Sequence, residues 1–134
     1  MLTENDILIN LAKYLENQGF AIKQHLNTSQ TGYDLIAEKE NERLFVEAKG
    51  ETSSKETARA GKPFDSGQIK SHVGQAILAS FKVISKMPGG ERTKAAIALP
   101  NNKGHKKLIE SIMPALNQIG IRVYLVDSES VIEL

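Results

Sequence analysis

GYDLIAEKENERLFVEAKG, residues 32–50, is the stretch of sequence that decides the fold. Two largely apolar runs, 33–39 and 42–49, flank the polar pair Glu40-Asn41. Short runs rich in apolar, branched and aromatic residues predict strands, and a polar pair between two of them predicts a tight turn, although this one lacks the glycine that strengthens the signal. The stretch therefore predicts a β-hairpin.

The position of the turn determines which residues lie opposite each other in this hairpin. A turn centred between Glu40 and Asn41 places Asp34 directly opposite Glu47. Directly opposed residues share one face of a sheet, with Cβ atoms roughly 4.5–5.5 Å apart. Because side chains alternate along a strand, Lys49 points to the same face as Glu47. The hairpin thus predicts two carboxylates and one amine grouped at a strand end.

Such a group of side chains has a definite chemistry. Two neighbouring carboxylates repel unless a positive charge lies between them. Mg²⁺ suits that gap, because it binds one or two carboxylates, keeps several waters and leaves room for a phosphate. The ion can polarise a phosphodiester and help to generate a hydroxide, and Lys49 could orient that water or offset phosphate charge. We therefore predict a catalytic metal site at Asp34, Glu47 and Lys49.

The same three residues have a simpler explanation as a solvated hairpin face. An E-x-K triplet is expected about once by chance in a chain of this length and composition. Two features favour the site. Glu47 and Lys49 follow Leu44-Phe45-Val46, an apolar run typical of a central strand. Gly50 and a long loop come directly afterwards, which leaves a cleft open at the strand end.

Outside the hairpin, hydrophobic periodicity completes the fold prediction. Helices are expected at 3–18, capped by Thr3 and ended at Gly19, at 67–86, capped by Ser66, and at 103–118, kinked or divided by Pro114; further strands are expected at 20–26, 95–100, 121–127 and 130–134. The order α-β-β-β-α-β-α-β predicts one α/β domain over residues 1–134, with a mixed central sheet and helices on both faces.

The 17-residue segment 50–66 shows no periodicity and is rich in Gly, Ser, Thr and charged residues. Loops of this length in a small domain are either functional or disordered. We predict a mobile loop here, which could become ordered on DNA and close over the cleft.

Length and composition limit the class of protein. The chain has 134 residues, of which 40% are hydrophobic and 25% charged, as in one ordinary globular domain. No apolar run is long enough to span a membrane, and the first residues lack the basic region of a signal peptide. The absence of cysteine excludes disulfides and thiolate metal sites and fits a cytoplasmic protein. Since the net charge is only +1, DNA would have to bind a local basic patch.

The motif residues carry a family resemblance. GYDL (32–35) and FVEAKG (45–50), separated by a hairpin, resemble the motif of the PD-(D/E)XK superfamily, also called restriction-endonuclease-like nucleases. The resemblance covers most of the chain, because the α-β-β-β-α-β order around the motif is the core of that family. It implies a restriction-endonuclease-like αβββαβαβ fold, similar to that of small junction-resolving or restriction nucleases.

The resemblance also implies roles for the motif residues. Asp34 and Glu47 would bind a divalent ion, Mg²⁺ or Mn²⁺, together with the backbone carbonyl of Ala48, and Lys49 would assist the attacking water. Tyr33 stands where the family often has a proline.

The helix after the motif supplies further candidates. SGQIKSHVGQAILAS (66–80) resembles the family helix from which a glutamine often reaches back to the active site. A stripe at helical spacing, expected largely opposite the apolar face, contains Gln68, His72, Gln75, Ala79 and Lys82. Gln75 is the first candidate and Gln68 the second, against the alternative of a solvated polar face. His72 could be a general base, but a surface or phosphate-contacting role is favoured.

Many members of the family add an acid from the first helix, and the candidates here are Glu4, Asp6 and Glu16. We favour Glu4, although Glu4 and Asp6 are equally explained as partners of the helix dipole. Candidate phosphate contacts are Lys55, Arg59 and Lys62 in the loop, and Lys103, His105, Lys106 and Lys107 at the start of the third helix. Cations are unfavourable at a helix N-terminus, which hints at phosphate binding, but a solubilising turn explains them as well.

Together these patterns predict a Mg²⁺-dependent DNA endonuclease that acts as a homodimer on two strands. An exonuclease or an RNA substrate stays open. Two other classes of function are a non-catalytic nucleic-acid-binding protein with a nuclease fold, and a subunit whose cleft is completed by a partner. The intact Asp34, Glu47 and Lys49 argue against the non-catalytic class.

Overall fold

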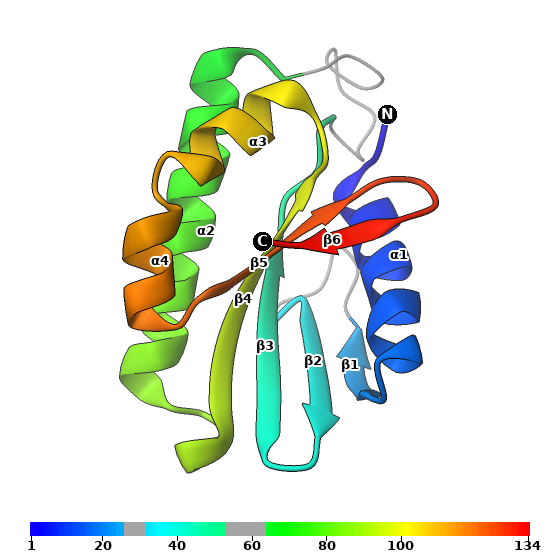
Figure 1. Cartoon of the computed structure of the whole chain (residues 1–134), viewed down its shortest axis with the longest axis vertical. Helices are drawn as coiled ribbons and strands as arrows, with labels where there is room; N and C mark the ends of the chain where they lie inside the picture. The colour runs from blue at the N-terminus through cyan, green and yellow to red at the C-terminus, as the bar shows by residue number, and fades with distance from the viewer. Residues whose placement is uncertain (26–31, 53–63) are drawn as a thin grey trace.

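The computed structural model describes residues 1–25, 32–52 and 64–134 of the chain. The described elements are, in order, α1 (Glu4–Asn17), β1 (Ala21–His25), β2 (Leu35–Lys39), β3 (Glu42–Ala48), α2 (Ser66–Lys86), the 3₁₀ helix η1 (Gly90–Arg92), β4 (Thr93–Pro100), α3 (Lys103–Glu110), α4 (Met113–Ile119), β5 (Arg122–Val126) and β6 (Val131–Glu133). The six described strands form one sheet in the order β1-β2-β3-β4-β5-β6 (Figure 1). The prediction of an α/β protein with a mixed sheet is confirmed.

The two halves of the sheet are connected differently. β1, β2 and β3 are antiparallel neighbours, β3, β4 and β5 run parallel, and β6 returns antiparallel to β5. The parallel steps use helical crossovers, α2 between β3 and β4, and α3 with α4 between β4 and β5. Both β3 and β5 therefore have one parallel and one antiparallel neighbour, and β3 is the one that carries the motif.

The hairpin has the predicted register. Pairing runs from Lys39 opposite Glu42 to Leu35 opposite Val46, around a turn in which Glu40 has φ +47°. Asp34 lies one residue before β2, so it continues the register toward Glu47 beyond the last paired position. The turn at Glu40-Asn41 is therefore confirmed, and the acidic residue of the motif lies just outside the ladder.

Helices cover both faces of the sheet, as predicted. α1 packs on one face against a buried cluster that includes Leu35, Leu44 and Val46. α2, α3 and α4 cover the other face, over a second cluster that includes Phe45 and Ile97. Because side chains alternate along β3, Glu47 and Lys49 continue the Phe45 face and point toward α2.

The helix ends follow ordinary capping chemistry, with one correction. Thr3 caps α1 in a reciprocal pair with Asp6, and Gly19 follows its end with φ +96°. Ser66 is not the cap of α2: it is the first residue of the helix, and Asp65 is the cap. The Asp65 carboxylate accepts the Gln68 N–H at 2.9 Å, a stronger acceptor than a serine hydroxyl.

Pro114 divides the third predicted helix into α3 and α4, where it occupies the first turn of α4. Within the described ranges, no helix has both the length and the apolarity needed to cross a membrane.

An ion pair fastens the start of β3 to the start of β5. Arg122 donates through both terminal guanidinium nitrogens to the two carboxylate oxygens of Glu42, in the bidentate geometry that strengthens such pairs. This contact lies at the hairpin end of the sheet, away from the motif, and it lowers the pKa of Glu42.

Candidate active site

Three carboxylates converge where β3 ends. Glu47 is the penultimate residue of β3, Asp34 immediately precedes β2, and Glu4 is the first residue of α1. All three side chains are partly buried. They come from segments far apart in the sequence, and the sheet and α1 bring them to one edge of the fold. Asp34, Glu47 and Glu4, the acids predicted to belong to the site, therefore lie together.

The backbone of β3 holds Asp34 in place. Asp34 Oδ2 accepts the Ala48 N–H at 2.9 Å. The N–H and C=O of one strand residue point toward the same neighbouring strand, so the carbonyl of Ala48 also faces the Asp34 side. This geometry places the predicted carbonyl ligand beside the two motif carboxylates.

Gly50 brings Glu4 to the same edge. A Cβ on Gly50 would lie 2.6 Å from the Glu4 backbone nitrogen and 2.8 Å from the Thr3 carbonyl carbon, distances that real Cβ atoms do not adopt. Only glycine lets the first turn of α1 pack against the end of β3 this closely. The Glu51 N–H donates to the Leu2 carbonyl and the Leu2 N–H donates to the Glu51 side chain, which fixes the contact.

Burial and mutual repulsion disfavour the charged forms of these acids. Burial, followed by the charge of Asp34, raises the pKa of Glu4 to about 7. The same two causes raise the pKa of Glu47, and burial raises the pKa of Asp34 even though the hydrogen bond from Ala48 opposes the shift. Lys49 lowers all three pKa values without cancelling the shifts. The site therefore has a deficit of positive charge, which a bound cation would reduce.

Lys49 is positioned from two sides. Its Nζ lies 3.6 Å from Glu47 Oε1 and donates a long 3.4 Å hydrogen bond to Gln75 Oε1. The contact connects α2 to the motif, and it places Gln75, the glutamine favoured from the sequence, at the candidate site. The Lys49 side chain is 17% exposed, so its amine is partly shielded from solvent.

The other residues of the α2 stripe do not form a uniform solvated face. The stripe borders the buried face of Val73, Ala76, Ser80 and Val83 instead of lying opposite to it. Gln68 is engaged in the cap of α2, where its Oε1 accepts the Asp65 N–H at 2.9 Å. His72 packs edge-on against Phe64, with ring centroids 4.5 Å apart. Burial and the charge of Lys49 lower the pKa of His72, which favours the neutral ring at pH 7.

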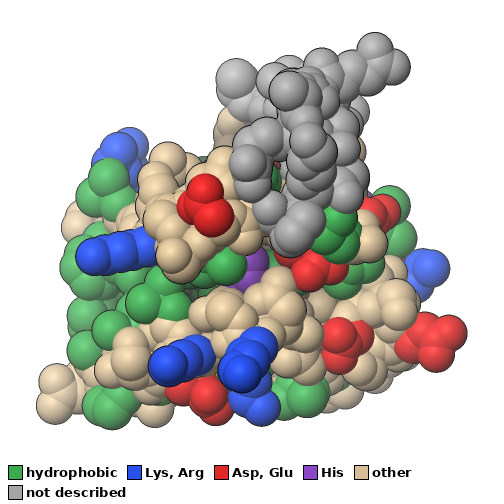
Figure 2. All heavy atoms as spheres, turned by 90° about the horizontal axis from the view of Figure 1, so that it is seen from above, with side chains coloured by type: hydrophobic (Ala, Val, Ile, Leu, Met, Phe, Trp, Pro, Cys, Tyr) green, Lys and Arg blue, Asp and Glu red, His purple; other side chains and the backbone are tan. Residues whose placement is uncertain are grey.

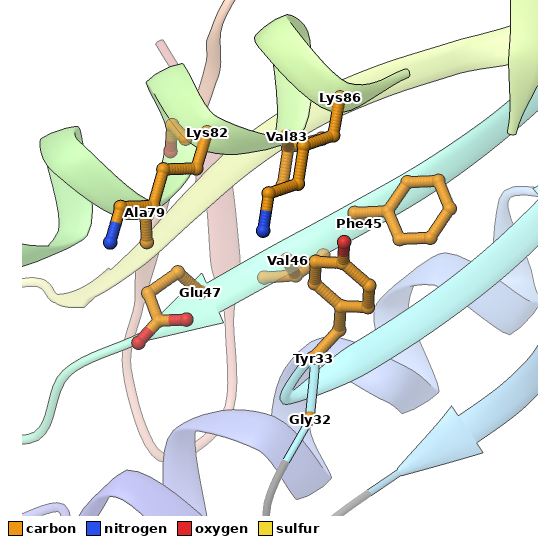
Figure 3. A pocket seen from close by; sticks show the side chains of 10 residues that line it. Gly32, Tyr33, Phe45, Val46, Glu47, Ala79, Lys82, Val83 and Lys86 are labelled. Atoms are coloured by element: carbon orange, nitrogen blue, oxygen red, sulfur yellow. The ribbon is translucent and has the colours of Figure 1, made fainter. Parts of the chain in front are cut away.

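A groove runs from the carboxylates along α2. Figure 3 shows it between β3 and α2, with Glu47 at one end, Tyr33 on one side, and Lys82 and Lys86 projecting from α2 on the other. Its volume is about 420 Å³, within the range of about 300–1,000 Å³ typical of small-molecule sites. Its lining includes Phe45, Val46, Ala79 and Val83. From the sequence, Tyr33 was notable only because it stands where the family often has a proline, and Lys86 was not a candidate.

A second polar network buttresses the site and was not predicted. Glu51 Oε1 accepts the Leu2 N–H at 2.8 Å, and Glu51 Oε2 accepts from Asn102 Nδ2 at 2.9 Å. Asn102 Oδ1 in turn lies 2.8 Å from Nδ1 of His105. The network ties the first residues of the chain, the segment after β3 and the start of α3 together. In the sequence, only Glu51, the acidic residue directly after the motif, pointed to this network.

His105 is not a surface cation. It is 0% exposed, and burial lowers its pKa to about 4, so the ring is neutral at pH 7. The expectation that it offers positive charge to phosphate is therefore wrong. The α3 lysines, including Lys106, are exposed. Lys55, Arg59 and Lys62 lie outside the described residues. Figure 2 looks onto the end of the molecule where β3 ends and shows acidic, basic and uncharged side chains intermixed, with a histidine near the centre of the view.

Among residues 1–25, 32–52 and 64–134, no three or more His, Cys, Asp or Glu side chains are grouped so that together they could hold a metal ion. A hard cation such as Mg²⁺ does not need such a group, because it is bound through one or two carboxylates and retains water. Asp34, Glu47 and the Ala48 carbonyl match that smaller donor set.

The chain matches no family model, no curated protein and no solved structure. The functional argument therefore rests on the residues and geometry of this chain.

Proposed function

We propose that this chain is a Mg²⁺- or Mn²⁺-dependent nuclease that hydrolyses phosphodiester bonds in DNA, as an endonuclease. The observation that carries the proposal is the convergence of Glu4, Asp34 and Glu47 around Lys49 at the end of β3. In a structural ion pair one acid faces one base, whereas this cluster sets three carboxyl groups against one lysine. Perturbed carboxylates beside a groove are typical of catalytic sites.

The topology supports the same class of protein. α1 is followed by the antiparallel strands β1, β2 and β3, then by α2 and the parallel strand β4. This is the order that the resemblance to restriction-endonuclease-like nucleases implies. The motif acids also occupy the expected places, one at the start of β2 and the other at the end of β3. Fold likeness alone does not establish an activity, so the proposal depends on the side chains at the site.

The donor set fits a divalent ion. Asp34, Glu47 and the carbonyl of Ala48 would hold it, and Glu4 is near enough to take part through water. When bound, such an ion supplies charge stabilisation for the phosphate and lowers the pKa of bound water. Magnesium keeps several waters in sites of this kind, which suits a site with so few protein donors.

The protein side chains then have separate roles. The Lys49 amine, held by Glu47 and Gln75, offers positive charge and hydrogen bonds to the phosphate or to the attacking water. Hydrolysis forms a new P–O bond from water and breaks the bond to the leaving oxygen. The water loses a proton and the leaving oxygen gains one. A partly buried site strengthens these electrostatic contributions because solvent screens them less.

Two copies of the site could cut both strands of a duplex in one encounter, so we propose a homodimer. On α2, Leu78 and Phe81 are 56% and 42% exposed, and they are candidates for the contact between copies. Mass measurement in solution by light scattering tests the dimer independently of activity.

The decisive experiment is cleavage of supercoiled plasmid and branched DNA with Mg²⁺ or Mn²⁺, comparing wild type with Asp34→Asn and Lys49→Ala. We expect nicking by the wild type and a loss of about 10²–10³-fold or more in each variant. Lys13→Ala, an exposed lysine on α1, is the matched control and should cut normally. Equal cutting by Lys49→Ala would contradict the site.

Calorimetry with Mn²⁺ supplies a readout besides activity. Wild type should bind the ion and Asp34→Asn should bind it more weakly. DNA binding without metal binding or cleavage would instead favour the non-catalytic nucleic-acid-binding protein.

A further inference from the structure

The groove beside Glu47 has a mixed chemistry that the cleavage site alone does not require. Phe45, Ala79 and Val83 give it an apolar floor. Tyr33 forms one side, packed edge-on against Phe45 with centroids 4.9 Å apart. An apolar floor with an aromatic wall suits a flat, weakly polar group better than a phosphate or a sugar.

The opposite side of the groove is positive. Lys82 and Lys86 are exposed on α2 and project over the groove toward Tyr33 and Glu47 (Figure 3). In the part of the chain that the structure describes, neither lysine has a carboxylate within ion-pair distance. Their spacing of four residues places them one helical turn apart. Two uncompensated amines along an apolar groove complement a flat group that carries a phosphate.

We propose that this groove binds one unpaired nucleotide of a DNA strand next to the phosphate that is cut. The base lies on the apolar floor beside Tyr33, and Lys82 and Lys86 contact the backbone. This inference rests on the proposed nuclease function and deepens it, because it names single-stranded or unpaired DNA as the preferred substrate. A base inside a duplex is stacked between its neighbours, so its face cannot reach a side chain until it is unpaired.

The proposal predicts a dependence on the base that electrostatic attraction does not produce. Stacking of a base on an aromatic side chain strengthens binding by about ten-fold or more and tolerates any base. Lysine contacts to phosphate act on every strand alike and weaken with salt. The two contributions can therefore be separated with strands that have the same phosphates and differ only in their bases.

The test is fluorescence anisotropy in EDTA with three labelled probes of equal length: single-stranded oligothymidine, the same strand with abasic sugars, and a blunt duplex. Wild type should bind oligothymidine about ten-fold more tightly than the abasic strand. Tyr33→Ala should lose that preference, and Tyr33→Phe should keep it because the ring remains. The double variant Lys82→Gln/Lys86→Gln should weaken both single strands, whereas the control Lys94→Gln, an exposed lysine on β4, should weaken neither.

Equal binding of the oligothymidine and abasic strands by wild type would overturn the inference. So would tighter binding of the duplex, or a base preference that survives Tyr33→Ala. Because EDTA removes the metal, these outcomes are independent of cleavage. A protein that cuts plasmid but shows no base preference keeps the nuclease proposal and loses this one. Thermal unfolding of each variant confirms that the binding changes occur in folded protein.

Discussion

The two ends of β3 place the same residue type in opposite electrostatic surroundings. At the start of the strand, Glu42 is paired with both terminal nitrogens of Arg122, and its pKa is lowered. Near the end, Glu47 has Lys49 at 3.6 Å, yet burial and the charge of Asp34 raise its pKa. The surroundings of Glu42 stabilise its charged form, whereas those of Glu47 disfavour it.

This difference separates a structural charge from a candidate catalytic charge. Glu42 and Arg122 connect β3 to β5 and satisfy each other, so nothing further is needed there. At the other end, three acids share one lysine. Repulsion among the acids lowers the stability of the fold, so the arrangement is expected where it serves a function. Proteins store unfavourable interactions of this kind at functional sites. The comparison therefore predicts that substitutions at the two ends affect different properties.

The largest expected effect comes from Glu47→Gln, compared with Glu42→Gln. Glu47→Gln removes a proposed ligand and a partner of Lys49, and cleavage should fall by about 10²–10³-fold or more. Its stability should not fall, because the change relieves crowding among carboxylates. Glu42→Gln should keep cleavage and lose about 1 kcal/mol of unfolding free energy, since it weakens a charged, half-exposed hydrogen-bonded pair. Plasmid nicking and urea unfolding measure the two properties.

The matched pair also shows how this comparison could fail. If Glu42→Gln lost activity as severely as Glu47→Gln, the two ends of β3 would not be functionally distinct. If Glu47→Gln unfolded at much lower urea than wild type, Glu47 would have a structural role.

A smaller effect is expected in the pH dependence of stability, with opposite signs at the two ends. The pKa of Glu4 is about 7 in the folded protein and 4.5 as an ordinary value, so folding takes up a proton between these limits. The contribution of Glu4 to the free energy of unfolding should therefore fall as pH rises from about 4.5 to about 7, while buried His105, with a pKa of about 4, contributes in the opposite direction over nearly the same window. Glu42 acts in the other direction: its contribution is present above pH 4.5 and is lost as pH falls through its lowered pKa.

Urea unfolding across pH 3 to 8 tests both signs, with pH values on the order of one unit apart. The free energy of unfolding of Glu4→Gln should rise relative to wild type as pH increases from about 4.5 to 7, and Glu42→Gln should flatten the loss below 4.5. A Glu4→Gln curve that parallels wild type across the upper window would show that Glu4 titrates normally. Cleavage should rise over the same window, because deprotonated carboxylates bind the metal.

Much of the fold follows from local sequence patterns. The hairpin register was predictable because the polar turn at Glu40-Asn41 and the apolar runs beside it agree. The division at Pro114 follows from the missing N–H of proline. The cap of α2 was misplaced by one residue, because Asp65 and Ser66 are both good caps and only the geometry of the turn decides between them.

Those residues of the candidate site that lie on the β2–β3 hairpin could be predicted from the sequence. Those that reach the site through contacts between distant segments could not. Asp34, Glu47 and Lys49 are related by the alternation and register of a hairpin. Glu4 comes within reach only because Gly50 allows a close packing of α1 that no periodicity encodes. Glu51 and His105 depend on contacts between distant loops, and an amphiphilic residue such as histidine gives no sign of burial in the sequence.

The smallest expected effect comes from Gln75→Ala, which tests whether α2 positions Lys49, the proposed catalytic lysine. Gln75 accepts a long 3.4 Å hydrogen bond from Lys49, and its side chain is exposed. Loss of this contact leaves Lys49 near Glu47 but less well oriented, so kcat should fall about three- to ten-fold with little change in KM.

Gln75→Glu should keep an acceptor for Lys49 and retain more activity than Gln75→Ala, although it adds negative charge. Gln118→Ala, an exposed glutamine on α4, is the control for a general surface effect. An unchanged kcat in Gln75→Ala would mean that Glu47 alone orients Lys49. The difference between the lowered pKa of Glu42 and the raised pKa of Glu47 would then depend on the strands and not on α2.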